Sequence, residues 1–303
     1  NLDARGTIRW EDDTLFVGDV GENKFRAIFT PTSQNYDSVI FEITINVEQA
    51  TIDMSGVSFE STTKVYNGQE QSIEATNIPE GVRVSYEGSG IDVGTYEIKA
   101  TFTAEDSRNY KVSVSEKTAT LTVEQATIDT SSIEFTSTTK VYNGQEQNIE
   151  VTNIPEGVTV SYEGSGTDVG TYTIKATFTA EDSRNYKVSV SEKTATLTIE
   201  QATIDMTDVT FENKSVIYNG QAQRIEATNV PTGVTVSYEE NDKIDVGTYE
   251  VKAIFTAEDS RNYKVSVSEK TATLTIEQAT IDMTDVTFEN KSVIYNGQVQ
   301  RIE

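Results

Sequence analysis

A near-identical stretch of sequence recurs along this chain, and it constrains the architecture more than any other feature. The hexapeptide Glu-Gln-Ala-Thr-Ile-Asp begins at Glu48, Glu124, Glu200 and Glu277, at spacings of 76, 76 and 77 residues. Self-similarity at a fixed period is typical of chains built from small modules in series. We therefore expect the 303 residues to form short modules rather than two domains of about 150 residues each.

The repeat divides the chain into five segments. The first two complete copies differ at 11 of 76 aligned positions, and the third copy has one extra residue. The segments are an incomplete related module at 1–49, repeats at 50–125, 126–201 and 202–278, and the truncated start of a further repeat at 279–303. The simpler interpretation is a fragment of a longer array. The alternative is that the front and back fragments of neighbouring chains complete each other by strand addition.

The extra residue of the third copy lies in the segment Glu239–Lys243, between Tyr238 and Tyr249. Because surface turns tolerate insertions and paired strands do not, this segment is predicted to be a turn.

Hydrophobic residues alternate with polar ones in each copy, which indicates half-buried β-strands. Tyr96, Ile98, Ala100 and Phe102 share one face of the clearest strand. The same alternation recurs at Val82/Val84/Tyr86, Tyr110/Val112/Val114 and Ala119/Leu121/Val123. It recurs more weakly at Ile73/Ala75. The threonine and valine content disfavours helices.

Six or seven short strands per copy predict an all-β fold of tandem, small, antiparallel, immunoglobulin-like β-sandwich modules. Asn67-Gly68 and its equivalents are predicted to form hairpin turns. No Gly-, Pro- or Ser-rich spacer separates one copy from the next, so we expect restricted bending and an elongated, monomeric rod.

The charge of the chain excludes several function classes. It carries 49 acidic and 24 basic residues, a net charge of -25, and this disfavours binding to nucleic acid or to anionic membranes. It contains no cysteine and no histidine, which excludes disulfides, Cys/His zinc sites and Ser-His or Cys-His nucleophiles. We expect no membrane insertion, since no long apolar stretch is present.

No catalytic, cofactor-binding or metal-binding residue is predicted, and the chain is not expected to be an enzyme. Paired carboxylates such as Asp12-Asp13, Glu105-Asp106 and Glu239-Glu240 are interpreted as solvated surface, because each copy carries the same net charge of -6. Calcium at the junctions, held by Glu124 and Asp129 with loop carboxylates, is an open alternative.

Two further side-chain roles are predicted. A Lys–Asn crosslink would have to use Lys117, which shares the inward parity of Ala119 and Leu121. The aromatic residues Tyr96, Phe102, Tyr110 and Trp10 are expected in the core rather than in a ligand platform.

The pattern Ala-Thr-Ile-Asp…Val-Tyr-Asn-Gly-Gln…Asp-Val-Gly-Thr-Tyr…Ala-Glu-Asp-Ser-x-Asn-Tyr resembles the MBG-type, immunoglobulin-like tandem repeats of large bacterial surface proteins and adhesins. The front segment, with Gly6…Trp10…Asp19-Val-Gly…Asn35-Tyr36, is similar to a related repeat. The resemblance implies extracellular display on a bacterial cell, and it carries over no catalytic motif.

The expected function is that of structural stalk or spacer repeats that project a distal binding domain towards an unidentified host or cell-surface ligand. The alternative is that the repeats themselves bind host glycan or protein multivalently. A binding array should show the same exposed aromatic or apolar patch on every module, and a spacer should show none.

Overall fold

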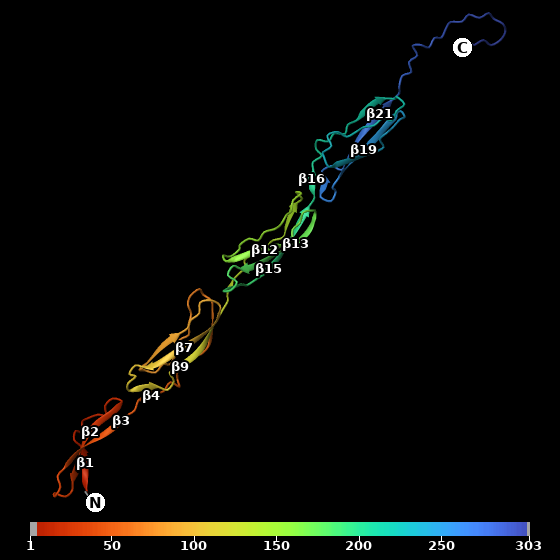
Figure 1. Cartoon of the computed structure of the whole chain (residues 1–303). Helices are drawn as coiled ribbons and strands as arrows, with labels where there is room; N and C mark the ends of the chain where they lie inside the picture. The colour runs from red at the N-terminus through yellow and green to blue at the C-terminus, as the bar shows by residue number, and fades with distance from the viewer. Residues whose placement is uncertain (1–4, 302–303) are drawn as a thin grey trace. The chain divides into compact units, whose positions relative to one another are not determined.

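A computed structural model describes residues 5–301, and every helix or strand in this range is a β-strand (Figure 1). The outermost residues of the predicted front and back segments, 1–4 and 302–303, lie outside the described range. No helix of the described chain is long and apolar enough to cross a membrane. The all-β prediction is confirmed.

The chain forms two compact units, and the division runs through the second repeat. The first unit extends to Ile133 and also includes Asn153–Ser161 and Thr177–Glu192. The second unit contains the rest of the second repeat and everything that follows it. Each contact described below lies within one of these units.

The front module is a single antiparallel sheet in the order β1-β2-β3. Its strands are β1 (Gly6–Trp10), β2 (Gly21–Pro31) and β3 (Val39–Val47). Ala27 is the one buried hydrophobic residue of its described part. Trp10 remains 43% exposed and contacts Phe25 edge to face, with ring centroids 6.2 Å apart. The prediction that Trp10 is a core residue is therefore wrong, because the strands of the described front module form one sheet in which Ala27 alone is a buried hydrophobic residue.

Each of the three repeats contains six strands in the same order. Repeat 1 has β4 (Ala50–Ile52), β5 (Thr62–Val65), β6 (Val82–Glu87), β7 (Gly94–Ala104), β8 (Tyr110–Val112) and β9 (Glu116–Glu124). Repeat 2 has β10 (Ala126–Ile128), β11 (Thr138–Val141), β12 (Val158–Glu163), β13 (Gly170–Ala180), β14 (Tyr186–Val188) and β15 (Glu192–Glu200). Repeat 3 has β16 (Ala202–Ile204), β17 (Lys214–Ile217), β18 (Val234–Glu239), β19 (Gly247–Ala257), β20 (Tyr263–Val265) and β21 (Glu269–Glu277).

The pairing of these strands is mixed rather than purely antiparallel. In repeat 1 a four-stranded sheet has the order β5-β9-β7-β6, and β4 pairs separately with β8. Strands β6, β7 and β9 are antiparallel as predicted, but β5 runs parallel to β9 and β4 parallel to β8. A chain that enters a module at one end and leaves at the other has its first and last strands in the same direction. The first and last strands, β4 and β9, are not themselves neighbours, and each pairs in parallel with another strand: β4 with β8, and β9 with β5.

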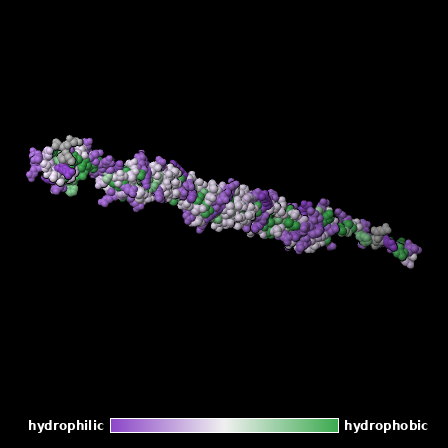
Figure 2. All heavy atoms as spheres, turned by 90° about the horizontal axis from the view of Figure 1, so that it is seen from below, coloured by the Kyte–Doolittle hydropathy of each residue, from purple (hydrophilic) through white to green (hydrophobic). Residues whose placement is uncertain are grey.

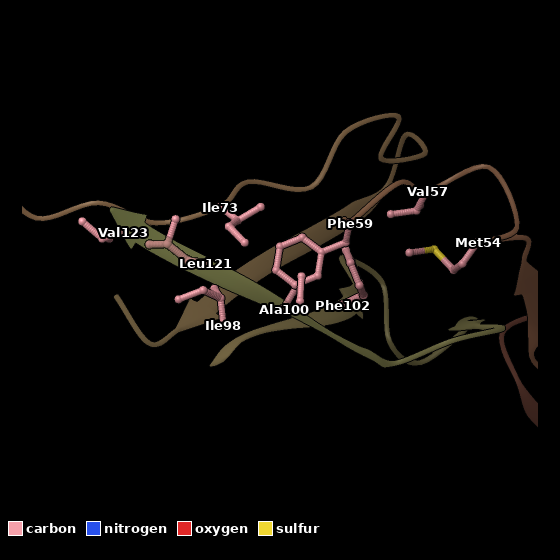
Figure 3. Close-up of a cluster of buried hydrophobic side chains, with 10 residues drawn as sticks. Met54, Val57, Phe59, Ile73, Ile98, Ala100, Phe102, Leu121 and Val123 are labelled. Atoms are coloured by element: carbon pink, nitrogen blue, oxygen red, sulfur yellow. The ribbon is translucent and has the colours of Figure 1, made fainter. Parts of the chain in front are cut away.

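The core of repeat 1 lies on the inner face of the four-stranded sheet (Figure 3). Ile98, Ala100 and Phe102 of β7 are at most 2% exposed, which confirms the predicted inward face of this strand. Leu121 of β9 is also fully buried. Repeat 3 buries the equivalent residues Val251, Ala253, Phe255 and Leu274.

The layer opposite this sheet is mostly irregular, and the weakly predicted strand at Ile73/Ala75 does not form. Only single bridges, Ser58 to Thr76 and Gln71 to Gly90, connect this part of the chain. The backbone N–H of Ala75 donates instead to the hydroxyl of Tyr86, at 2.8 Å. A side chain therefore takes the place of a ladder bond.

The Asn-Gly turns also differ from the prediction. The backbone N–H of Gln69 donates to Oδ1 of Asn67 at 2.9 Å, which is an Asx turn. Gly68 has a φ of 75°, whereas Asn67 is not among the residues with positive φ. A two-residue type I′ hairpin needs positive φ at both positions, so the hairpin prediction is wrong although a turn is present.

The extra residue of the third copy lies between β18 and β19, which confirms the turn prediction. Glu240 and Asp242 in this turn have φ values of 58° and 67°.

The turn also changes the surroundings of a tyrosine that all three repeats share, which is Tyr96 in repeat 1 and Tyr249 in repeat 3. In repeat 1 the hydrogen at the Cα of Gly90 faces the Tyr96 ring so closely that an added Cβ would lie 2.3 Å from ring carbons. In repeat 3 the equivalent position is Lys243, whose ammonium lies 5.2 Å from the Tyr249 ring centroid.

We expect Gly90→Ala to destabilise repeat 1 by about 1–3 kcal/mol, because the new methyl group must displace the Tyr96 ring. Differential scanning calorimetry of the full chain should show a lower melting temperature for the transition of this repeat. The matched control is Gly56→Ala, where an added Cβ meets no atom within 4 Å. An equal loss in both variants would contradict this explanation.

Candidate functional site at the module junctions

Very little chain connects one repeat to the next. Strand β9 ends at Glu124 and β10 begins at Ala126, and β15 and β16 are likewise separated by Gln201 alone. A one-residue connection leaves few backbone torsions free, so side chains at the ends of consecutive modules are brought into contact.

Asn185 is the central residue of the junction between repeats 1 and 2. Its Oδ1 accepts a hydrogen bond from the backbone N–H of Val93, at 2.8 Å. Its Nδ2 donates to Oδ1 of Asp92 in repeat 1 at 3.1 Å and to Oδ2 of Asp182 in its own loop at 2.9 Å. The side chain is only 5% exposed, so these bonds are sheltered from water. Asn185 therefore joins the two repeats through both ends of its amide.

The same arrangement recurs between repeats 2 and 3 and between the front module and repeat 1. Asn262 accepts from Val169 N–H at 2.8 Å and donates to Asp168 and Asp259 at 3.1 and 3.0 Å. At the front junction, Asn109 accepts from Val20 N–H at 2.9 Å and donates to Asp19 and Asp106 at 3.0 and 2.9 Å. We name the arrangement of asparagine, two aspartates and valine N–H the asparagine clamp.

An arginine adds an ion pair to each asparagine clamp. Arg184 Nη1 lies 3.1 Å from Oδ2 of Asp92, and the equivalent distances are 2.7 Å for Arg108–Asp19 and 3.0 Å for Arg261–Asp168. The arginine side chains are 65–68% exposed. Exposed pairs of this kind contribute about 0–1 kcal/mol, so the asparagine, which is buried at Asn185 and Asn262 and half-buried at Asn109, is the stronger part of the junction.

The connecting glutamine holds the loop that carries the asparagine clamp. Gln125 Nε2 donates to the carbonyl of Ser183 at 2.8 Å, and the N–H of Ala126 donates to the carbonyl of Asn185 at 2.9 Å. Gln49 and Gln201 make the same bonds to Ser107 and Ser260, each at 2.8 Å. The linker glutamine thus holds in place the loop that contacts the preceding module.

Tyrosine rings meet at two of the junctions. Tyr66 and Tyr186 contact edge to face with ring centroids 5.3 Å apart, and Tyr142 and Tyr263 repeat this contact at the same distance. Tyr110, the equivalent of Tyr186, is 46% exposed and makes no ring contact within residues 5–301. The prediction that Tyr110 is a core residue is therefore wrong, and the equivalent Tyr186 and Tyr263 contact the preceding repeat rather than the core of their own. Phe102 is buried and Tyr96 packs partly buried against the core, as expected.

The asparagine clamp also shifts the ionisation of its loop aspartate. Hydrogen bonds from the Asn185 side chain and from backbone N–H groups hold the pKa of Asp182 below its ordinary value. A carboxyl with a lowered folded-state pKa stabilises the fold above its unfolded pKa. That contribution is lost as the pH falls through the lower, folded-state value.

We expect Asn185→Ala to raise the pKa of Asp182 towards the ordinary aspartate value, because the largest stabilising hydrogen bond is removed. The carboxyl carbon shift, followed by NMR as the pH falls below about 4, measures this change. Asp106, whose own partner Asn109 is intact in this variant, serves as the control. An unchanged Asp182 titration would contradict the assignment.

Of the residues proposed as calcium ligands, Asp129 accepts hydrogen bonds from neighbouring serines and Glu124 is exposed. Oδ1 of Asp129 accepts from Ser131 N–H at 2.9 Å and from Ser189 Oγ at 3.1 Å. Glu124 is exposed at the end of β9. The described residues contain no group of three or more acidic side chains placed to hold a metal ion.

Lys117, the lysine considered for a Lys–Asn crosslink, donates to a main-chain carbonyl. The ammonium of Lys117 donates to the carbonyl of Val57, and Lys270 of repeat 3 donates to the equivalent Val209. Neither contact involves the asparagine side chain that a Lys–Asn crosslink requires.

The paired carboxylates serve local structure. Asp106 belongs to the asparagine clamp, Asp12 accepts from the hydroxyl and N–H of Thr14, and Glu240 pairs with Lys243.

A shallow polar groove recurs beside the edge strand of each repeat. In repeat 1 it has a volume of about 680 Å³, and it recurs at the corresponding place in repeats 2 and 3. Its lining in repeat 1 includes Thr62, Lys64, Asn67, Glu70 and Glu74. The recurring exposed apolar residue next to it is a single side chain per repeat, Val65, Val141 or Ile217, at 57–63% exposure. Beside this groove the repeats thus share one exposed apolar side chain rather than an apolar patch.

Sequence reasoning did not identify the asparagine clamp. The available signal was the recurrence of Asp-Val-Gly and Asp-Ser-Arg-Asn-Tyr at constant spacing, with Asp19-Val20-Gly21 preserved in the front module. Asparagine and aspartate are common in turns, so this recurrence was compatible with turn formation alone.

Comparison with known proteins gives one family match. The sequence model described as MBG domain matches residues 55–127, 131–203 and 207–280. No curated protein sequence matches the chain.

Several solved structures resemble the chain at low sequence identity. The protocadherin gammaB4 extracellular domain is 10% identical with a TM-score of 0.30, and the match covers 84% of this chain but only 53% of that one. SGBP-B of the Bacteroides ovatus mixed-linkage glucan utilization locus, in complex with a mixed-linkage heptasaccharide, is 10% identical with a TM-score of 0.17, covering 74% and 68%.

A SusE-like surface located polysaccharide binding protein from Bacteroides thetaiotaomicron is 8% identical with a TM-score of 0.17, covering 90% of this chain and 81% of that one. These TM-scores are too low for the likenesses to carry an argument about this chain.

Proposed function

Because the chain belongs to the MBG domain family, with three copies of the domain in tandem, we propose that it is a spacer segment of a bacterial cell-surface adhesin. In this role the repeats set the distance between the cell and a distal binding domain. The observation that carries the proposal is the recurrence of the asparagine clamp at the three junctions that precede repeats 1, 2 and 3. A spacer transmits position only if its joints resist bending, and this contact set serves that purpose.

The connections support the same role. One-residue links, held by Gln125 and Gln201, leave no flexible segment between repeats. Flexible linkers would let the modules reorient freely and would shorten their mean reach.

The surface chemistry also suits an extended extracellular segment. Hydrophilic residues are spread over the visible face of the modules (Figure 2), and each repeat carries a net charge of -6. Uniform negative charge keeps near-identical modules soluble and discourages association between chains. The proposal assigns no catalytic step and no cofactor to the chain, and it places the ligand-binding function in a separate domain.

Small-angle X-ray scattering tests the spacer role. We expect the full chain to have a larger maximum dimension than a variant in which Asn109, Asn185 and Asn262 are all alanine, because loosened joints let the modules fold back. A variant with Arg108, Arg184 and Arg261 replaced by alanine is the matched control and should change much less. Equal dimensions in all three proteins would overturn the proposal.

A second candidate function, multivalent binding by the repeats, is favoured by the polar groove. The groove recurs on every repeat and presents hydroxyl, amide, carboxylate and ammonium groups, which suits a polyhydroxylated ligand. Lys64→Ala and Lys140→Ala, made together, should weaken binding of the chain to an immobilised glycan array if the groove is a site. Absence of binding by the unaltered chain in that assay would leave the spacer role alone.

A further inference from the structure

Two tyrosine pairs join consecutive repeats in the same geometry. Tyr66 directly follows β5 and Tyr186 begins β14, and their ring planes make an angle of 84° at a centroid separation of 5.3 Å. Tyr142 and Tyr263 form the second pair, at 84° and 5.3 Å. All four rings are half-buried. Two phenol rings are therefore in direct contact at each of these junctions.

The surroundings of these phenols suit loss of a proton together with an electron. Burial raises the pKa of Tyr66, with smaller contributions from Tyr186 and from the carboxylates of Asp182 and Asp92. The pKa of Tyr142 is raised in the same way, by burial and then by Tyr263, Asp259 and Asp168. The phenols of Tyr66 and Tyr142 are thus neutral at physiological pH, and carboxylates lie near the rings of both pairs.

We propose that Tyr66–Tyr186 and Tyr142–Tyr263 are oxidative cross-linking sites, at which a carbon–carbon bond between the two rings joins consecutive repeats covalently. The proposal rests on the junction contacts and does not depend on the spacer role.

The reaction needs an external two-electron oxidant, such as hydrogen peroxide acting through a haem peroxidase. Each phenol loses one electron and one proton, and the two phenoxyl radicals form a bond between their Cε carbons. The hydrogen on each bonded Cε then moves to the phenolic oxygen, which restores both aromatic rings. The peroxide takes up the two electrons and two protons and becomes two molecules of water.

Within the described residues no other two tyrosine rings are in contact. Tyr86 and Tyr162 contact Phe59 and Phe135, whose phenyl rings cannot form phenoxyl radicals. Tyr110 provides a built-in comparison, because it occupies the position of Tyr186 without a ring partner in the described chain. The chain contains no cysteine to compete for the oxidant.

The experiment treats the full chain, at high dilution, with haem peroxidase and hydrogen peroxide, followed by tryptic peptide mapping. We expect the peptide Val65–Arg83, which carries Tyr66, to be linked to the tripeptide Asn-Tyr-Lys, with a mass two hydrogen atoms below the sum of the two. That tripeptide is identical around Tyr110, Tyr186 and Tyr263, so variants must assign it.

Tyr186→Phe should abolish the link to Val65–Arg83, whereas Tyr110→Phe should leave it intact. Phenylalanine keeps the ring packing, so a purely structural role of Tyr186 would not produce this difference. Dityrosine fluorescence should fall by half in Tyr66→Phe and vanish when Tyr142→Phe is added. A link that survives Tyr186→Phe, or dityrosine found only between separate chains, would overturn the proposal.

Discussion

Replacing Phe102 by alanine should unfold repeat 1 while repeat 3 remains folded. Phe102 is 2% exposed at the centre of the core of its repeat, and truncation of a buried phenylalanine costs about 3–5 kcal/mol. A module of this length is stabilised by roughly 4–11 kcal/mol in total, so the loss equals the whole stability at the lower end of this range. Repeat 3 has its own core around Phe255 and shares none of these contacts.

Hydrogen exchange with mass spectrometry can separate the two repeats, because their peptides differ in sequence. The amides of β7 should lose protection in Phe102→Ala, and those of β19 should keep it. The matched control is Phe16→Ala in the front module, where the side chain is 91% exposed and the expected change is within about 0.5 kcal/mol. Retained protection in β7 would contradict the assignment of this core.

Replacing Asn185 by alanine should loosen the junction between repeats 1 and 2 without unfolding either repeat. The substitution removes three sheltered hydrogen bonds and leaves the Val93 N–H without its acceptor. An unsatisfied buried group costs about 1–3 kcal/mol. The Val93 amide should therefore exchange roughly 5- to 150-fold faster with solvent, which NMR measures directly.

Two comparisons make this prediction specific. The Val169 amide, bonded to the intact Asn262, should keep its exchange rate in the same sample. Arg184→Ala removes only a pair with a 65% exposed guanidinium and should slow or speed Val93 exchange by less than about 5-fold. If Arg184→Ala has the larger effect, then the exposed ion pair and not the buried amide holds the junction.

The predictability of the fold differed between strands. The central strands β7 and β9 were predictable because a strand with one buried face must alternate hydrophobic and polar residues. The parallel partners β4 and β5 were not, since direction depends on where the chain enters the module. The segment around Ile73 alternates weakly and is completed by the hydroxyl of Tyr86, a contact across 11 residues that no local pattern encodes.

The candidate site was predictable only as a recurring pattern. Asn185, Arg184 and Asp92 stand in loops, where their residue types are explained by turn formation alone. Asp92 and Asn185 are separated by 93 positions, and only the packing of one module against the next brings their side chains together. The same reason explains Tyr186, the equivalent of Tyr110, whose ring contacts Tyr66 of the preceding repeat rather than the core of its own.

The sequence alone determined the number of repeats, the β-class, the turn that holds the extra residue and the inward face of β7. Each of these depends on local periodicity or on comparison of one copy with the next, and both are properties of the linear chain. Only the tertiary structure decided the strand directions, the irregular second layer, the asparagine clamp and the tyrosine pairs. These depend on contacts between residues far apart in sequence, whose geometry is set by the path of the chain through and between the modules.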